Sequence, residues 1–137
     1  MGLLSVFDIA GSGMSAQTVR LNTVASNMAN ANNVSTEKGD AYRAKMPVFA
    51  TVMQDVNTNN ESAGVRVMRI EESNLEATRL YDPGNPLANE QGYVYQANVN
   101  SIEEMANMIS ASRSYQNNVE VMNTAKQLLQ ATLKLGQ

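Results

Sequence analysis

The chain has 137 residues, which is enough for one ordinary domain or for a small domain with long extensions, but not for two full-sized domains. Its formal net charge is −3 with both signs scattered along the chain, so it lacks the basic stripe that binds nucleic acid and the polybasic cluster that binds lipid directly. It contains no Cys and no His, and we therefore expect no enzymatic activity, no cofactor and no metal site.

The first segment carries apolar residues at a spacing of seven. One row consists of Phe7, Met14, Leu21 and Met28, and a second row of Leu3, Ala10, Val24 and Ala31 is interrupted by Gln17. This heptad-like stripe predicts one long helix over residues 3–31. Gly11 and Gly13 lie inside it, and each costs about 1 kcal/mol relative to Ala unless a neighbour packs closely there.

Both ends of this first helix carry boundary signals. Ser5 and Asp8 form the pattern of a capping box, so the regular helix is expected to start near Ser5. The segment 27–40, NMANANNVSTEKGD, is rich in residues that favour turns and helix endings. Its Asn cluster is either a recognition element, for export or for a neighbouring subunit, or a helix-end cap, and the capping interpretation is favoured. The cluster consists of Asn27, Asn30, Asn32 and Asn33.

Residues 37–100 have a different character and predict a small β-rich insert. The strand signals are Tyr42, Val48, Phe49, Val52 and the alternating pair Val65 and Val67. Between them, residues 54–64 read QDVNTNNESAG and predict a loop. Residues 81–93 read YDPGNPLANEQGY, in which two prolines bracket Gly84 and Asn85 and exclude a helix, so we expect a shaped loop there.

A second long helix is predicted over residues 101–135. Ser101 and Glu104 form a capping box, and Glu103 favours the positive end of the helix dipole. Its stripe consists of Ile102, Met105, Met108, Ser112, Tyr115, Val119, Met122, Leu129 and Leu133, with Lys126 as an exception. The expected fold is therefore mainly α with a small β-rich insert. The terminal helices are expected to pair as an antiparallel coiled-coil-like hairpin.

The length of the two predicted helices favours assembly with other chains over a hairpin that is complete within one chain. A helix of 35 residues is about 50 Å long, whereas a compact insert of 60 residues is about 27 Å across, so the insert cannot cover both helices. An ordinary intramolecular hairpin remains the alternative. Because glycines and polar residues weaken each helix alone, the ends are expected to order fully only with partners.

Four segments resemble the rod and hook axial proteins of the bacterial flagellum, and within them the proximal rod subgroup. They are FDIAGSGMSAQTVRLNTVASNMANANNVST at 7–36, AYRAKMPVF at 41–49, YDPGNPLANEQGYVYQANVN at 81–100, and EEMANMISASRSYQNNVEVMNTAKQLLQATLKLGQ at 103–137. Asn27, Ala29 and Asn30 match the Asn-Ala-Asn motif of the family. The chain departs from the family pattern at Asn33, where Thr is common, and at Ala97, where Pro is usual.

The resemblance implies a structural subunit of the proximal rod in the periplasmic part of the flagellar basal body. Residues 1–36 and 101–137 would form the inner tube of a hollow drive shaft that transmits torque and conducts exported subunits, with residues 37–100 outside. The implied partners are other copies, other rod proteins, the flagellar type III export apparatus, and the membrane ring and export gate through an adaptor rod protein. Residues 1–17 contain no general secretory signal, so export without cleavage is expected.

The expected assembly interface follows the two stripes and the family motifs. It consists of Phe7, Met14, Leu21, Val24, Met28, Asn27, Asn30, Met105, Met108, Arg113, Tyr115, Val119, Met122, Leu129 and Leu133. A helical adaptor for another exported protein is an alternative that the stripes alone also permit. A peptidoglycan hydrolase using Glu103 and Glu104 is disfavoured, because adjacent helical residues point about 100° apart.

Overall fold

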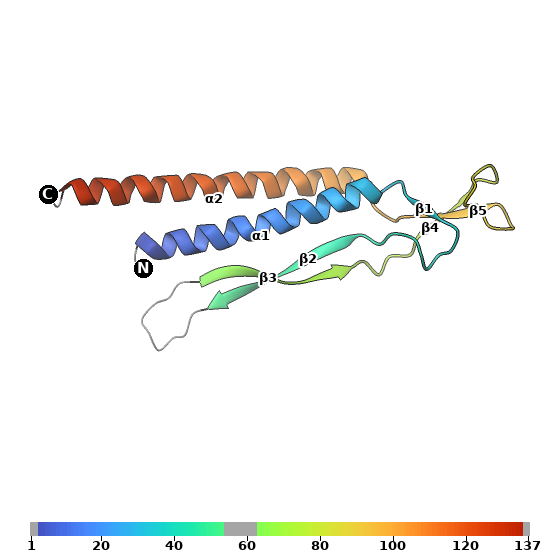
Figure 1. Ribbon diagram of the computed structural model, residues 1–137, viewed down its shortest axis with the longest axis horizontal. Helices are drawn as coiled ribbons and strands as arrows, with labels where there is room; N and C mark the ends of the chain where they lie inside the picture. The colour runs from blue at the N-terminus through green and yellow to red at the C-terminus, as the bar shows by residue number, and fades with distance from the viewer. Residues whose placement is uncertain (1–2, 54–62, 136–137) are drawn as a thin grey trace.

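The computed structural model describes residues 3–53 and 63–135 (Figure 1). Helix α1 (Leu3–Asn30) comes first along the chain and helix α2 (Ser101–Leu135) comes last, and the β-strands lie between them in sequence. The strands are β1 (Val34–Ser35), β2 (Lys45–Met53), β3 (Ala63–Glu72), β4 (Thr78–Tyr81) and β5 (Tyr93–Gln96). The predicted pair of long terminal helices around a small β-rich insert is confirmed, and both helices match their predicted bounds to within one residue.

Helix α1 forms the middle layer, with α2 on one side and the β2–β3 hairpin on the other (Figure 1). Near one end of α1, Asn27 bonds to Glu104 of α2, and near the other end Gly13 lies against Asn118. The residue number in α2 therefore rises as the number in α1 falls, and the two helices run in opposite directions. On its other side, the Ser12 hydroxyl of α1 accepts a hydrogen bond from the Val65 amide of β3 at 3.1 Å.

The insert is divided into two separate sheets. Strands β2 and β3 form an antiparallel hairpin with a register shift between Val48 and Phe49. The other sheet has the order β1-β5-β4 and lies beyond the C-terminal end of α1 (Figure 1). The expectation of one compact insert was therefore wrong, because the hairpin lies along α1 and uses that helix as its support. Residues 54–62 of the predicted loop lie outside the described residues, and Ala63 and Gly64 belong to β3.

The connection between β4 and β5 is the shaped loop that the two prolines predict. The Asn85 amide donates to the Asp82 carbonyl at 3.2 Å, and the Asp82 amide donates to the Gly92 carbonyl at 2.9 Å. Gly92 has a φ of 79°, a left-handed conformation that side chains other than glycine rarely adopt. The rings of Tyr81 and Tyr93 pack edge to face at 5.1 Å and close the base of the loop.

Both predicted capping boxes were wrong. Leu3 and Leu4 are already helical, so Ser5 lies inside α1 and is buried there. At the start of α2 the cap is Asn100, whose side-chain oxygen accepts the Ile102 amide at 3.0 Å. Asn caps a helix at least as well as Ser, and it stands one residue earlier in the chain, so it takes the capping position from Ser101.

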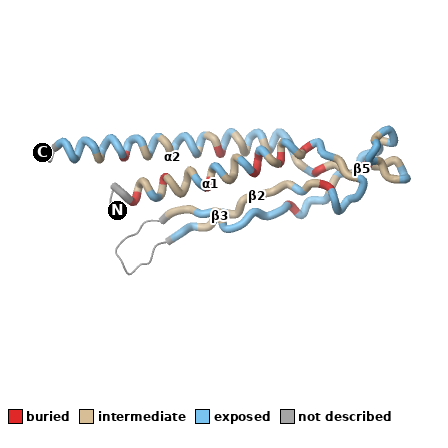
Figure 2. Tube along the Cα trace, in the orientation of Figure 1, coloured by how far each residue is buried: buried red, intermediate tan, exposed pale blue. Residues whose placement is uncertain are grey.

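The core is shallow and is made largely of small side chains. Buried apolar residues are mostly alanines, on α1, on α2 and around the second sheet, together with Val24 and Val94. Figure 2 shows these buried positions as short segments along α1, with most of α2 exposed. Burying an alanine contributes less than burying a leucine, so the isolated chain gains little from its core compared with a domain built on large side chains. Lys38 and Glu76 add an exposed ion pair at 2.9 Å, which lowers the pKa of Glu76.

The two glycines of α1 provide a matched pair for testing how closely the helices pack. A Cβ atom at Gly13 would lie 2.9 Å from the Asn118 side-chain nitrogen, whereas a Cβ at Gly11 would meet nothing within 4 Å. We expect Gly11→Ala to raise the free energy of unfolding by about 0.5–1 kcal/mol through helix propensity. Gly13→Ala is expected to gain clearly less, because Asn118 must move. Urea unfolding followed by circular dichroism measures both, and equal gains would contradict the close approach at Gly13.

Candidate assembly interface

The face of α2 that lies against α1 is built from two heptad rows. One row consists of Glu104, Ala111, Asn118 and Ala125, and the other of Met108, Tyr115, Met122 and Leu129. Ala111 is completely buried, and Ala125 is nearly so. Small side chains at these positions let the two helix backbones approach, as Gly13 does from the side of α1. We call this contact between α1 and α2 the seam.

Only one of these two rows was predicted from the sequence. The predicted stripe included Met108, Tyr115, Met122 and Leu129, but it left out Ala111 and Ala125 because it followed larger side chains. Ile102 was placed on the stripe, yet it is 81% exposed and lies on the opposite side of α2. The seven-residue spacing of Glu104, Ala111, Asn118 and Ala125 is the sequence pattern that could have identified the missed row.

Asn27 is the main polar contact of the seam and is only 1% exposed. Its amide nitrogen donates to the Lys45 carbonyl at 2.8 Å and to the Glu104 carboxylate at 3.0 Å. Its amide oxygen accepts the Lys45 backbone amide at 2.8 Å and the Tyr42 hydroxyl at 2.9 Å. One side chain thus uses both of its donors and both of its lone pairs, and joins α1, α2, β2 and the segment before β2.

The four Asn residues near the end of α1 have different roles. Asn27 does not cap the helix, which corrects the favoured interpretation for this residue. Asn30 donates to the Ser26 carbonyl at 2.8 Å, and the Asn33 side chain donates to the Asn30 side chain at 2.7 Å. These two residues close the last turn of the helix, as the capping interpretation predicts. Asn32 is exposed.

The remaining predicted residues of α1 lie along the helix with intermediate exposure. Val24 is buried, whereas Phe7, Met14, Leu21 and Met28 are half-buried. These half-buried residues stand about 140–180° around α1 from Ser12, which contacts Val65 of the hairpin. Part of each of these apolar side chains is therefore still accessible to another molecule.

On α2 the predicted residues divide into two groups. Met108, Val119, Met122 and Leu129 are half-buried, whereas Met105, Arg113, Tyr115 and Leu133 are exposed. Arg113 forms no ion pair within residues 3–53 and 63–135. Of the two glutamates, Glu104 is bonded to Asn27 and Glu103 is exposed. The two carboxylates therefore do not face a common substrate.

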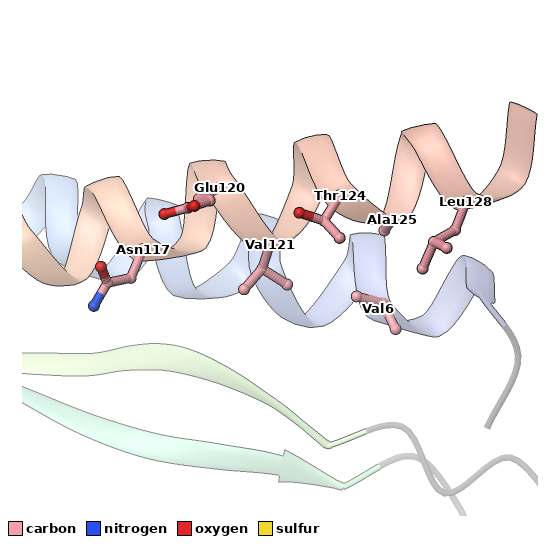
Figure 3. A pocket seen from close by; sticks show the side chains of 7 residues that line it. All are labelled: Val6, Asn117, Glu120, Val121, Thr124, Ala125 and Leu128. Atoms are coloured by element: carbon pink, nitrogen blue, oxygen red, sulfur yellow. The ribbon is translucent and has the colours of Figure 1, made fainter.

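A mainly apolar groove runs between the start of α1 and the second half of α2 (Figure 3). Val6 of α1 lines one side, and Val121, Ala125 and Leu128 of α2 line the other. Helix α2 continues beyond the N-terminal end of α1, where Leu133 is 65% exposed (Figure 1). The groove and the exposed Leu133 are thus two apolar features of the helical pair.

The described residues form neither a metal-binding cluster nor a membrane-spanning helix. Residues 3–53 and 63–135 contain no group of three or more acidic side chains placed to hold a metal ion. Neither α1 nor α2, over its described length, is long and apolar enough to cross a membrane.

The chain is similar to flagellar rod proteins: two family profiles match its terminal segments, and relatives match it over its full length. Residues 7–35 match a family profile described as flagella basal body rod protein, and residues 90–135 match the C-terminal profile of flagellar basal body rod FlgEFG proteins. The flagellar basal-body rod protein FlgC of Yersinia enterocolitica is 53% identical over 137 residues, covering all of both chains. FlgC of Salmonella typhimurium is 49% identical with the same coverage, and FlgC of Borreliella burgdorferi is 34% identical and covered to 99%.

Proposed function

The chain belongs to the family of FlgC flagellar basal-body rod proteins, and from this premise we propose that its paired terminal helices are the unit through which it polymerises. It is a structural subunit of the rod, not an enzyme, and it is located in the flagellar basal body. The observation that carries the proposal is the apolar surface left open on the helical pair. The groove at Val6 and the exposed Leu133 need a partner that the described residues of one chain do not supply.

In this proposal α1 and α2 pack as an antiparallel coiled-coil-like hairpin. Two observations support this packing. Asn27 bonds to Glu104 while Gly13 lies against Asn118, as opposite directions require, and the small residues of α2 recur at a spacing of seven. Residues 1–36 and 101–137 form the wall of the inner tube, and residues 37–100 lie outside it. The tube transmits torque and conducts exported subunits.

The partners in this proposal are other copies of the chain, other rod proteins and the flagellar type III export apparatus. An adaptor rod protein joins the assembled chain to the membrane ring and export gate. The shallow core supports export in an unfolded state, because a helix with Gly11 and Gly13 and a seam of alanines unfolds at little cost. The interface retains the predicted Arg113, which is exposed and available to a neighbouring subunit, and Tyr115, which lies in the seam but leaves part of its side chain accessible.

A substitution at Leu133 tests assembly without a large effect on folding. Because Leu133 is 65% exposed, Leu133→Asp is expected to change the free energy of unfolding by less than about 0.5 kcal/mol. In the assembled rod it places an unpaired charge in an apolar contact, which costs several kcal/mol. We expect the amount of chain in purified basal bodies to fall by about tenfold or more, since each 1.4 kcal/mol is a factor of ten. Swimming is expected to be lost.

Gln127→Asp is the matched control, because Gln127 is exposed and already polar, and it lies about 120° around α2 from Leu133. The control variant is expected to enter basal bodies in normal amount. Normal rods with Leu133→Asp would contradict the proposed role of this end of α2. Sedimentation of the purified chain with other rod proteins separates a polymer subunit from a soluble adaptor, because an adaptor forms a complex of fixed size.

A further inference from the structure

Gln17 interrupts an otherwise apolar row on the seam side of α1. It lies seven residues from Ala10 and seven from Val24, which are 2% and 4% exposed. At 100° per residue, Gln17 also lies only about 20° around the helix from Val6, which lines the groove against α2. The side chain of Gln17 therefore leaves α1 on the side that packs against α2.

The side-chain oxygen of Gln17 is buried, and it has no hydrogen-bond partner within residues 3–53 and 63–135. The neighbouring levels of the seam differ from it: Arg20 donates to the Asn107 side-chain oxygen at 3.2 Å, and Gly13 lies against Asn118. A buried acceptor that loses its water on folding and gains no donor lowers the folding equilibrium constant by about tenfold. Gln17 is therefore an unfavourable group in the packing of α1 on α2.

The two ends of the seam are held differently. Toward the insert, Asn27 uses both of its donors and both of its lone pairs, and Arg20 adds its bond to α2. From Gln17 toward the N-terminal end of α1, Gly13 lowers the helix propensity and the groove at Val6 leaves the contact with α2 incomplete. The polar group without a partner thus stands where the strongly bonded part of the seam gives way to the weak part.

We propose that Gln17 limits the stability of the helical pair in the free chain, so that residues 3–17 separate from α2 readily before assembly. The role of this limit rests on the proposed function, in which the chain is exported unfolded and completes its contacts in the rod. Methionine has about the length of glutamine and would continue the apolar row of Ala10 and Val24 without needing a donor. The amide therefore adds nothing to the packing of the folded chain, and its contribution is ease of unfolding.

Gln17→Met tests the physical part of the inference on the purified full chain. We expect the equilibrium constant for unfolding, measured in urea by circular dichroism, to fall about tenfold, because the buried oxygen is removed. Hydrogen exchange of the amides of residues 3–17 is expected to slow by at least fivefold. Ser15→Met is the matched control, since Ser15 is exposed and lies about 160° around α1 from Gln17, and it is expected to change either quantity by less than twofold.

Gln17→Leu repeats the measurement with a shorter apolar side chain, in case methionine packs poorly at this position. If neither variant unfolds less than the unmodified chain, the inference is overturned, because the oxygen of Gln17 then has a partner in the folded state.

Cells that express the full chain test the consequence for export. We expect the more stable variant at Gln17 to accumulate in the cytoplasm at least threefold over the unmodified chain at equal expression, and to be correspondingly depleted in purified basal bodies. Ser15→Met is expected to behave like the unmodified chain. A stabilised variant that leaves the cytoplasm and enters basal bodies in normal amount overturns the inference. Absence of the unmodified chain from basal bodies would instead overturn the proposed function.

Discussion

Replacing Asn27 by alanine is expected to destabilise the chain by about 3 kcal/mol or more. The substitution leaves the Lys45 backbone amide and carbonyl and the Glu104 carboxylate without the partner that they have in the native fold. Leaving a buried polar group unpaired costs about 1–3 kcal/mol, and more when the group is charged. Urea unfolding followed by circular dichroism measures the loss. The same variant is expected to reduce incorporation into basal bodies, because Asn27 fixes the level of α2 against the hairpin.

Asn32→Ala is the matched control for Asn27. Asn32 is exposed, and its replacement is expected to change stability by less than about 0.5 kcal/mol. Asn27→Asp keeps the shape of the side chain but loses its two donated bonds and sets a carboxylate beside Glu104. We expect it to lose at least as much as Asn27→Ala. If both variants at Asn27 unfold like the unmodified chain, the hydrogen bonds at this residue do not hold the three layers together.

The second large effect is expected for a charge in the seam. Ala111 is completely buried between the helices, so Ala111→Asp buries a carboxylate without a partner and overfills the closest part of the contact. An uncompensated buried charge costs about 3–5 kcal/mol. We expect the variant to lose most of its helical circular dichroism signal at 25 °C and to be absent from purified rods.

The neighbouring residue gives the control for this position. Ser110 is exposed, and Ser110→Asp introduces the same charge one residue away on another face of α2. It is expected to leave helix content and unfolding close to those of the unmodified chain. A pair of variants with equal stability would mean that α1 and α2 do not pack through Ala111, and the assignment of the seam would be wrong.

The sequence was sufficient for the elements that have strong periodicity. The bounds of α1 and α2 and the turn-rich connection between β4 and β5 were predicted, because apolar spacing and proline act locally. The division of the insert into two sheets was not predicted. It depends on contact between the β2–β3 hairpin and α1, through Ser12 and Val65 for example, and no local signal in either segment specifies that contact.

The seam was only half predicted, for a related reason. A stripe traced through large side chains finds Met108 and Met122 but misses the alanines on which close approach depends. The role of Asn27 was also missed. An asparagine near a helix end is usually a cap, and its use as a buried link among three elements depends on where Lys45 and Glu104 lie in the folded chain.

The shallow core and the open apolar surfaces have a common physical meaning. A chain that buries mainly alanine and polar groups within itself gains limited stability alone, whereas many of its leucines, isoleucines and methionines remain partly or largely exposed for other contacts. Such a chain gains a large part of its burial only when it assembles. This division between internal and external contacts fits a subunit of the rod.

A density map of the intact basal body tests the central claim most directly, because it locates every copy of this chain. We predict that α1 and α2 of each copy line the inner wall of the rod, that the groove at Val6 and the end of α2 at Leu133 are covered by neighbouring subunits, and that both sheets lie outside. A rod in which the helical pair of this chain faces outward, or in which these surfaces stay open, would contradict the account.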